Sequence, residues 1–205
     1  MKAILCGNST VGKTSILNAL TGVKDLGPTT PTLGAGCAKV TFQFNNQETV
    51  MNLWDTAGQE AYRSLIKIYF HGVKVAILIF DISNRQSFDD LDNWINDINE
   101  SCDREGCPIL LVANKIDLIE NRIISAEEIS KKAHELNCPF IEASALTRAG
   151  LKELLILAYR MGNGEKVPID PTEEFLSRDF RSYEAQKEQS IELTTSKDEK
   201  GGCCG

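Results

Sequence analysis

"GNSTVGKTS" (residues 7–15) is the stretch of the sequence that decides the fold. It matches the pattern G-x-x-x-x-G-K-[ST] without a substitution. In this pattern the glycines let backbone N–H groups point at a phosphate, the lysine reaches the β- and γ-phosphates, and the hydroxyl binds Mg²⁺. An apolar run at 2–6 and a helical pattern at about 13–20 provide the strand and the helix that such a loop requires. The residues expected around the phosphates are Asn8, Ser9, Thr10, Val11, Gly12, Lys13, Thr14 and Ser15.

Beyond this loop, short apolar runs alternate with helical patterns. Such alternation predicts an α/β fold with a mainly parallel sheet covered by helices on both faces. The runs at 39–44 and 48–54 alternate apolar with polar residues and predict a hairpin across Asn45–Asn46. Ser125-Ala-Glu-Glu128 matches a capping box at the start of a helix. The other expected strands are 75–82, 108–114 and 139–144, and the other expected helices lie near 87–100, 125–136 and 149–161.

Charge and length exclude several classes of function. The chain has 205 residues and a net charge of −7, so the molecule as a whole has no electrostatic reason to bind nucleic acid. Its longest apolar runs are far too short to span a bilayer. Neither the charged start nor the apolar core of a secretory signal is found, so none is expected.

A second motif, "ANKIDL" (113–118), follows an expected strand and bears on the choice of base. The Asp117 carboxylate can accept hydrogen bonds from the N1–H and the exocyclic amine of guanine, a pattern that adenine does not offer. A buried acceptor left unpaired costs free energy, so Asp117 favours guanine over adenine. The phosphate loop alone leaves a kinase or an ATPase open. The residues expected around guanine are Asn114, Lys115, Asp117, Ser144, Ala145 and Leu146.

"WDTAGQE" (54–60) adds groups suited to the γ-phosphate. Asp55, at a strand end, suits the second shell of Mg²⁺, bound through water. The Gly58 amide can approach the γ-phosphate closely, and Gln59 can orient an attacking water, which makes it the candidate catalytic residue. With GNSTVGKT, DTAGQE, NKID and SAL in this order and at these intervals, the chain resembles the Ras superfamily of small GTPases over about 1–162.

The resemblance extends to one subfamily. Residues 55–95 look like those of the Rab proteins, regulators of vesicle traffic. The family has a Mg²⁺-binding threonine in its first switch segment, eighteen residues after that of the phosphate loop, and Thr32 stands at this interval from Thr14. The resemblance implies a P-loop G domain whose six-stranded sheet is mostly parallel with one antiparallel edge strand. It also implies slow hydrolysis of GTP to GDP with Mg²⁺, accelerated by an activating protein.

The sequence departs from the family at two positions. Asp25 stands where an aromatic residue usually covers guanine, with Leu26 beside it. Cys37 stands where a Rab protein usually has a phenylalanine that packs with Trp54 and Tyr69. The departures predict either faster nucleotide exchange and different effectors, or neutral drift with Leu26 covering the base.

After about residue 164 the pattern of strands and helices stops. We expect a G domain at 1–164 and a flexible tail at 165–205, which carries ten acidic and six basic side chains. Cys203 and Cys204 resemble the doubly prenylated ends of Rab proteins, and two lipid chains hold a protein on a membrane well. The resemblance implies a place on the cytoplasmic face of an intracellular membrane, cycling with the cytosol. Implied partners are an exchange factor, an activating protein, effectors, a GDP dissociation inhibitor and the prenyl transferase machinery.

Two alternatives stay open from the sequence. One is an interaction module locked to its nucleotide without hydrolysis. The other is a branch of the Ras superfamily that works in signalling and not in trafficking.

Overall fold

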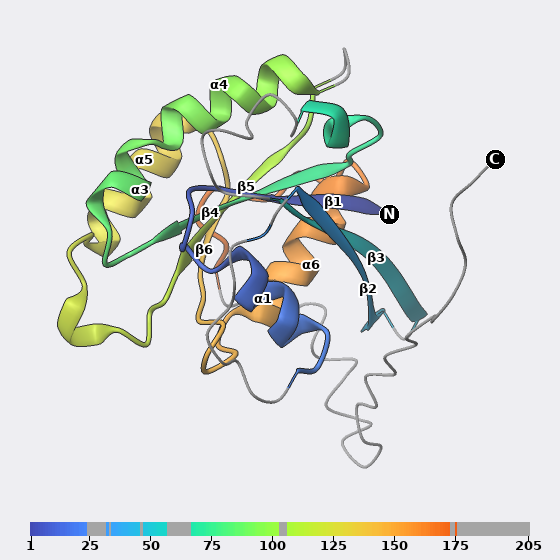
Figure 1. Cartoon of the computed structure of the whole chain (residues 1–205), viewed down its shortest axis with the longest axis horizontal. Helices are drawn as coiled ribbons and strands as arrows, with labels where there is room; N and C mark the ends of the chain where they lie inside the picture. The colour runs from blue at the N-terminus through green and yellow to red at the C-terminus, as the bar shows by residue number, and fades with distance from the viewer. Residues whose placement is uncertain are drawn as a thin grey trace.

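A computed structural model of the chain shows a six-stranded sheet with helices on both faces (Figure 1). The strand order is β2-β3-β1-β4-β5-β6, and every neighbouring pair is parallel except β2 with β3. The expected mostly parallel sheet with one antiparallel edge strand is therefore confirmed. The residues that the structure describes are 1–23, 32, 34–45, 47–56, 67–102, 106–172 and 175.

The elements follow the alternation that the sequence predicts. The strands are β1 (Lys2–Cys6), β2 (Ala35–Phe44), β3 (Gln47–Thr56), β4 (Val75–Asp81), β5 (Ile109–Asn114) and β6 (Phe140–Glu142). The α-helices are α1 (Lys13–Leu20), α3 (Arg85–Asp89), α4 (Leu91–Ser101), α5 (Ala126–Leu136) and α6 (Leu151–Gly162). Two short 3-10 helices, η2 (Lys67–Phe70) and η3 (Ile119–Asn121), complete the described elements. Among the described helices, none has the length and apolar character that crossing a bilayer requires.

Two elements differ from the expectation. The single helix expected near 87–100 is divided into α3 and α4 at Asp90, the C-cap of α3 and the N-cap of α4. Strand β2 begins at Ala35 and not at Lys39, because residues 35–38 continue the antiparallel register with β3. Those first four residues, Ala-Gly-Cys-Ala, are small and lack the alternation that marks a strand in a sequence.

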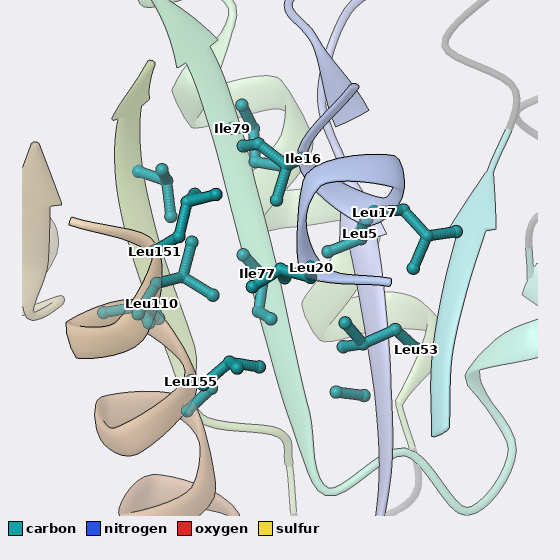
Figure 2. Packing of buried hydrophobic residues seen from close by; sticks show 14 of the residues in the cluster. Leu5, Ile16, Leu17, Leu20, Leu53, Ile77, Ile79, Leu110, Leu151 and Leu155 are labelled. Atoms are coloured by element: carbon teal, nitrogen blue, oxygen red, sulfur yellow. The ribbon is translucent and has the colours of Figure 1, made fainter. Parts of the chain in front are cut away.

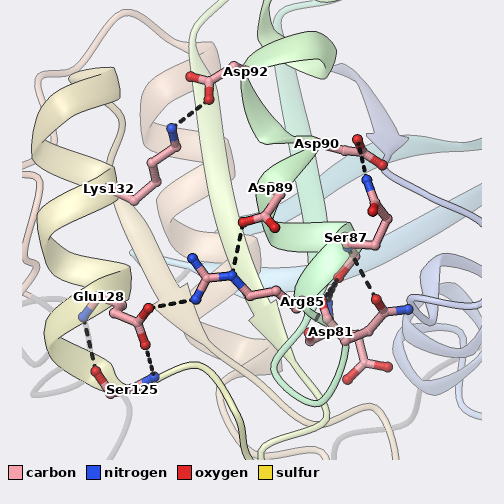
Figure 3. A network of polar contacts seen from close by, with 11 residues as sticks. Asp81, Arg85, Ser87, Asp89, Asp90, Asp92, Ser125, Glu128 and Lys132 are labelled. Atoms are coloured by element: carbon pink, nitrogen blue, oxygen red, sulfur yellow. Dashed lines mark hydrogen bonds and ion pairs between the residues drawn. The ribbon is translucent and has the colours of Figure 1, made fainter.

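The capping box that the sequence predicts is present at the start of α5. Ser125 Oγ accepts a hydrogen bond from the backbone N–H of Glu128 at 3.2 Å. The Glu128 carboxylate accepts one from the backbone N–H of Ser125 at 3.1 Å (Figure 3). These two bonds satisfy backbone donors that the first turn of a helix leaves without partners.

The core has one cluster on each face of the sheet. Strand β4 is buried along its whole length, and its side chains alternate between the two clusters. Ile77 and Ile79 face α1 and α6, with Ile16, Leu20 and other residues that Figure 2 labels. Leu78 and Phe80 belong to the opposite cluster. Burial on both faces explains why β4 reads as a continuous apolar run and not as an alternating one.

Part of the expected tail lies against the domain. The backbone N–H of Phe140 in β6 donates to the Ile169 carbonyl at 3.1 Å. Val167 and Phe175 pack on the core cluster beneath α6, and the guanidinium of Arg160 lies 4.8 Å from the centre of the Phe175 ring. These contacts fix backbone beyond residue 164. The boundary at 164 stays a prediction.

Candidate nucleotide site

The glycine loop joins β1 to α1 at the edge where parallel strands end. Gly7 has φ +131° and Gly12, the N-cap of α1, has φ +101°, both in a region that favours glycine. A Cβ on Gly7 would collide with the carbonyl oxygen of Ile79 in β4, and one on Gly12 with Nδ2 of Asn114 in β5. Gly7 is therefore required by close backbone approach, and Gly12 by its positive φ and by the Asn114 side chain against it. The loop has the shape expected of a phosphate cradle.

The Lys13 ammonium points back into this loop. Its Nζ donates to the carbonyl oxygens of Gly7 at 2.9 Å and Asn8 at 2.7 Å, and the residue is only 6% exposed. Burial lowers the pKa of Lys13 to about 8, and the neighbouring Asp55 carboxylate opposes this shift. A cation held by two carbonyl dipoles inside a loop is well placed to meet a phosphate.

Three oxygen-bearing side chains meet beside Lys13. Thr14 Oγ1 donates to Asp55 Oδ2 at 2.6 Å, and Thr32 Oγ1 donates to the same oxygen at 3.1 Å. The two hydroxyl oxygens lie 3.0 Å apart. Thr14 comes from α1, Asp55 from the end of β3, and Thr32 from the chain ahead of β2. This group of three side chains is called the oxygen cluster below.

The oxygen cluster fits a magnesium ion. Asp55 is 3% exposed, and its Oδ1 has no hydrogen-bond partner in the described part of the chain. A buried carboxylate oxygen without a partner suits a metal ion or its water shell. The described residues hold no group of three or more His, Cys, Asp or Glu around one point. Mg²⁺ is compatible with this, because it is usually bound by one or two protein oxygens together with phosphates and waters.

Asn114 connects the phosphate loop to the second motif. It ends β5, is 1% exposed, and donates through Nδ2 to the Val11 carbonyl at 2.8 Å. Its Oδ1 accepts from the backbone N–H of Ala145 at 3.3 Å. Asn114 thus connects the phosphate loop, the end of β5 and the loop after β6. The next residue, Lys115, has φ +68°, and its Nζ lies 2.7 Å from a carboxylate oxygen of the buried Asp81.

Asp117 and the loop after β6 lie on the side of the candidate site where guanine is expected. Ser144, which is fully buried, donates through Oγ to Asp117 Oδ1 at 2.5 Å and accepts from the backbone N–H of Thr147 at 3.0 Å. Leu146 is 68% exposed. The structure therefore joins the end of β5 and the loop after it to the loop after β6, through Asn114 with Ala145 and Asp117 with Ser144.

Other expected residues are exposed to different extents within the glycine loop and α1, or lie outside the described residues. Ser9 and Ser15 are partly exposed, and Thr10 is exposed with φ +66°. Gly58, Gln59, Asp25, Leu26, Cys203 and Cys204 lie outside the described residues.

The departure at Cys37 is visible on the sheet. Cys37 pairs in register with Trp54 and is exposed, and the Trp54 ring lies 5.6 Å from that of Tyr69. The two aromatic residues of the expected trio are thus together, with a thiol at the third position.

Three contacts of the site have no signal in the sequence. The Asn8 side chain binds Asp90 and Trp94, and the Arg148 guanidinium donates to the Val23 carbonyl at 2.8 Å. The partners are 82 to 125 residues apart along the chain. No local pattern links residues so distant, so only the fold reveals these contacts.

The six-stranded sheet with its glycine loop between β1 and α1 defines a P-loop GTPase fold. The chain belongs to the Ras family, whose family profile matches residues 2–161. Within that family it is a Rab-like small GTPase, and so a GTP-hydrolysing enzyme. Family membership sets aside the kinase or ATPase that the phosphate loop alone left open.

Curated relatives support the subfamily. The chain is 39% identical over 146 residues to a "Probable Rab-related GTPase" of Acanthamoeba polyphaga mimivirus, covering 70% of this chain and 67% of the relative. It is 35% identical over 152 residues to the "GTP-binding protein ypt3" of Schizosaccharomyces pombe, covering 74% and 71%. It is 36% identical over 152 residues to the "Ras-related protein Rab-18-B" of Danio rerio, covering 74% of both chains.

Proposed function

We propose that this Rab-like GTPase is a membrane-attached switch in vesicle trafficking, which recruits effectors when GTP is bound. The observation that carries the proposal is the oxygen cluster. Thr32 belongs to the chain ahead of β2, yet its hydroxyl lies 3.0 Å from that of Thr14 in the phosphate loop. A metal ion shared with a γ-phosphate would hold Thr32 there, and loss of that phosphate would release it.

The nucleotide would lie between the glycine loop and the loops after β5 and β6. Backbone N–H groups of the loop and the start of α1 would bind the phosphates, since a helix N-terminus favours anions. Asp117 would select guanine, with Ser144 holding its carboxylate in place at 2.5 Å. Residues proposed for the phosphates are 8–15, Thr32 and Gly58, and those for guanine are Asn114, Lys115, Asp117, Ser144, Ala145 and Leu146.

The chemistry would depend on positioning and on charge neutralisation. Mg²⁺, held by Thr14, Thr32 and, through water, Asp55, would supply positive charge beside the β- and γ-phosphates. Lys13 would turn from its two carbonyl partners toward the same oxygens. Gln59 would orient the attacking water, and the Gly58 amide would contact the γ-phosphate. Hydrolysis of this kind is slow until a partner protein supplies further charge.

The membrane part of the proposal depends on the tail. Prenylation of Cys203 and Cys204 would anchor the tail, residues 165–205, in the cytoplasmic face of an intracellular membrane. The G domain at 1–164 would then be held next to that membrane. Exchange between membrane and cytosol would use a GDP dissociation inhibitor. An exchange factor, an activating protein and the prenyl transferase machinery would complete the cycle.

Three measurements test the proposal. Single-turnover hydrolysis should yield GDP and phosphate. Replacing Thr32 by alanine should weaken Mg²⁺-dependent GTP binding more than GDP binding. Equal loss for both nucleotides would contradict a switch at Thr32. Mass spectrometry of the protein from its native cell should find Cys203 and Cys204 prenylated. Two free thiols there would contradict membrane attachment and favour a soluble signalling or interaction role.

A further inference from the structure

The Asn8 side chain points away from the phosphate loop and binds the helices behind it. Its Nδ2 donates to Asp90 Oδ2 at 2.6 Å, and its Oδ1 accepts from Trp94 Nε1 at 2.6 Å. We propose that this trio, called the Asn8 clamp below, positions the phosphate loop and sets how fast nucleotide leaves. Asn8 acts here as a positioning residue through its side chain, apart from any contact of its backbone with phosphate.

The chemistry of the clamp requires an amide at position 8. The indole N–H is only a donor, and an ionised carboxylate is only an acceptor. A side chain between Trp94 and Asp90 must therefore accept on one side and donate on the other. An asparagine does both, whereas an aspartate would place two carboxylates in contact.

Both partners of Asn8 are held in place. Trp94 is 3% exposed and belongs to the core cluster beneath α4. Asp90 stands at the junction of α3 and α4, where its Oδ1 accepts from Gln86 Nε2 at 2.9 Å. Figure 3 shows Asp90 on the same helix pair that Arg85, which is bonded to Asp89, connects to Glu128 of α5. The clamp thus attaches the loop to a fixed part of the fold.

The clamped residue also holds the lysine of the loop. The Asn8 carbonyl oxygen accepts from Lys13 Nζ at 2.7 Å, so the peptide that the clamp fixes is part of the Lys13 site. If the clamp is lost, this peptide can move, and the loop must be ordered again when phosphate binds. The inference rests on the proposed phosphate contacts of the loop. It predicts a faster release of GDP.

The test uses full-length protein loaded with a fluorescent GDP analogue, and release is followed after addition of excess GDP. Asn8→Ala should release the analogue roughly tenfold faster, since two hydrogen bonds, one of them to a charge, are lost. Asn163→Ala is the control, because Asn163 Nδ2 also donates a hydrogen bond, to the Tyr159 backbone carbonyl at 2.8 Å, but on the exposed end of α6. This control should release at the wild-type rate.

Exchanging the side chains of residues 8 and 90 distinguishes the effect of the clamp from the effect of a new negative charge in the phosphate loop. Asn8→Asp should accelerate release more than Asn8→Ala, because it places a carboxylate against Asp90. The double variant Asn8→Asp, Asp90→Asn restores one donor and one acceptor and should return release to within about threefold of wild type. If the double variant releases as fast as Asn8→Asp alone, the clamp is refuted.

Two readouts separate the clamp from other causes. Unfolding of part of the sample would lower the amount of analogue bound at saturation without changing the release rate of the remainder, and that result for Asn8→Ala would overturn the proposal. Both readouts, the amount of analogue bound and the release rate, are compared with those of wild type, because Asn8 itself belongs to the proposed phosphate contacts. If wild-type protein binds no guanine nucleotide, the proposed function fails; if it binds and Asn8→Ala releases normally, only the clamp fails.

Discussion

Replacing Gly12 by alanine perturbs the phosphate loop and the guanine-side loops at once. Gly12 has φ +101°, outside the region that an alanine adopts without strain. The added Cβ would also meet Nδ2 of Asn114, which is 1% exposed and braces both Val11 and Ala145. A single methyl group should therefore disturb both halves of the nucleotide site.

The magnitude follows from these contacts. The strained backbone of a non-glycine residue costs about 1–3 kcal/mol. If Asn114 moves, the Val11 carbonyl and the Ala145 N–H lose their partner, at roughly 1–3 kcal/mol for each buried group. The free protein can relax around the methyl group, whereas the bound state needs the loop in place. These contributions add to about 3–9 kcal/mol, which corresponds to GDP binding weakened by roughly 10² to 10⁶.

Calorimetric titration with GDP and Mg²⁺ measures the effect. Gly164→Ala is the matched control, because Gly164 has φ +82° and a Cβ there would meet nothing within 4 Å. It should lose some folding stability and no affinity for GDP. If Gly12→Ala binds GDP as tightly as wild type, Asn114 does not brace the loop, and the assignment of this site is wrong.

Three further predictions concern other parts of the domain. The pKa of Lys13 is about 8 without nucleotide, and phosphate favours its charged form. Affinity for GDP should thus hold below about pH 8 and fall by up to tenfold per pH unit above it, in titrations up to about pH 9; a flat profile would contradict the role of Lys13. Ser125→Ala removes the side chain that caps α5 and should lower the free energy of unfolding by about 1 kcal/mol in urea; no change would mean that Glu128 alone suffices. Arg148→Met removes the bond to the Val23 carbonyl, 2.8 Å long, and should accelerate GDP release, whereas Arg148→Lys should retain most of the wild-type rate; equal rates for both variants would refute this contact.

The parts of the fold that depend on local pattern were predictable from the sequence. The bounds of β1 and α1 agree with the runs on either side of the glycine loop. The positive φ and the close neighbours of Gly7 and Gly12 explain the two glycines of that loop. The capping box of α5 was also predictable, since all its partners lie within four residues. The break at Asp90 was not, because its residues keep a helical pattern on both sides.

Contacts between distant segments could not be predicted in this way. The Asn8 side chain reads as part of a phosphate motif, and nothing near it in the sequence points to Trp94, which is 86 residues away. The contact between Phe140 and Ile169 was missed for a similar reason, because the segment after 164 lacks periodicity and composition alone suggested a free tail. In both cases hydrogen bonds join segments that are distant in the sequence, and no local pattern predicts them.

In the proposed site, Asp117 and its neighbours bind guanine selectively while the glycine loop holds the phosphates. Competition against a bound fluorescent GDP analogue, with GTP and ATP compared on the same wild-type protein, tests it most directly. We predict that GTP displaces the analogue at stoichiometric concentrations and that ATP fails even in roughly thousandfold excess, because adenine lacks the pair of donors that guanine offers to the Asp117 carboxylate. Displacement by ATP at concentrations comparable to those of GTP would contradict the account.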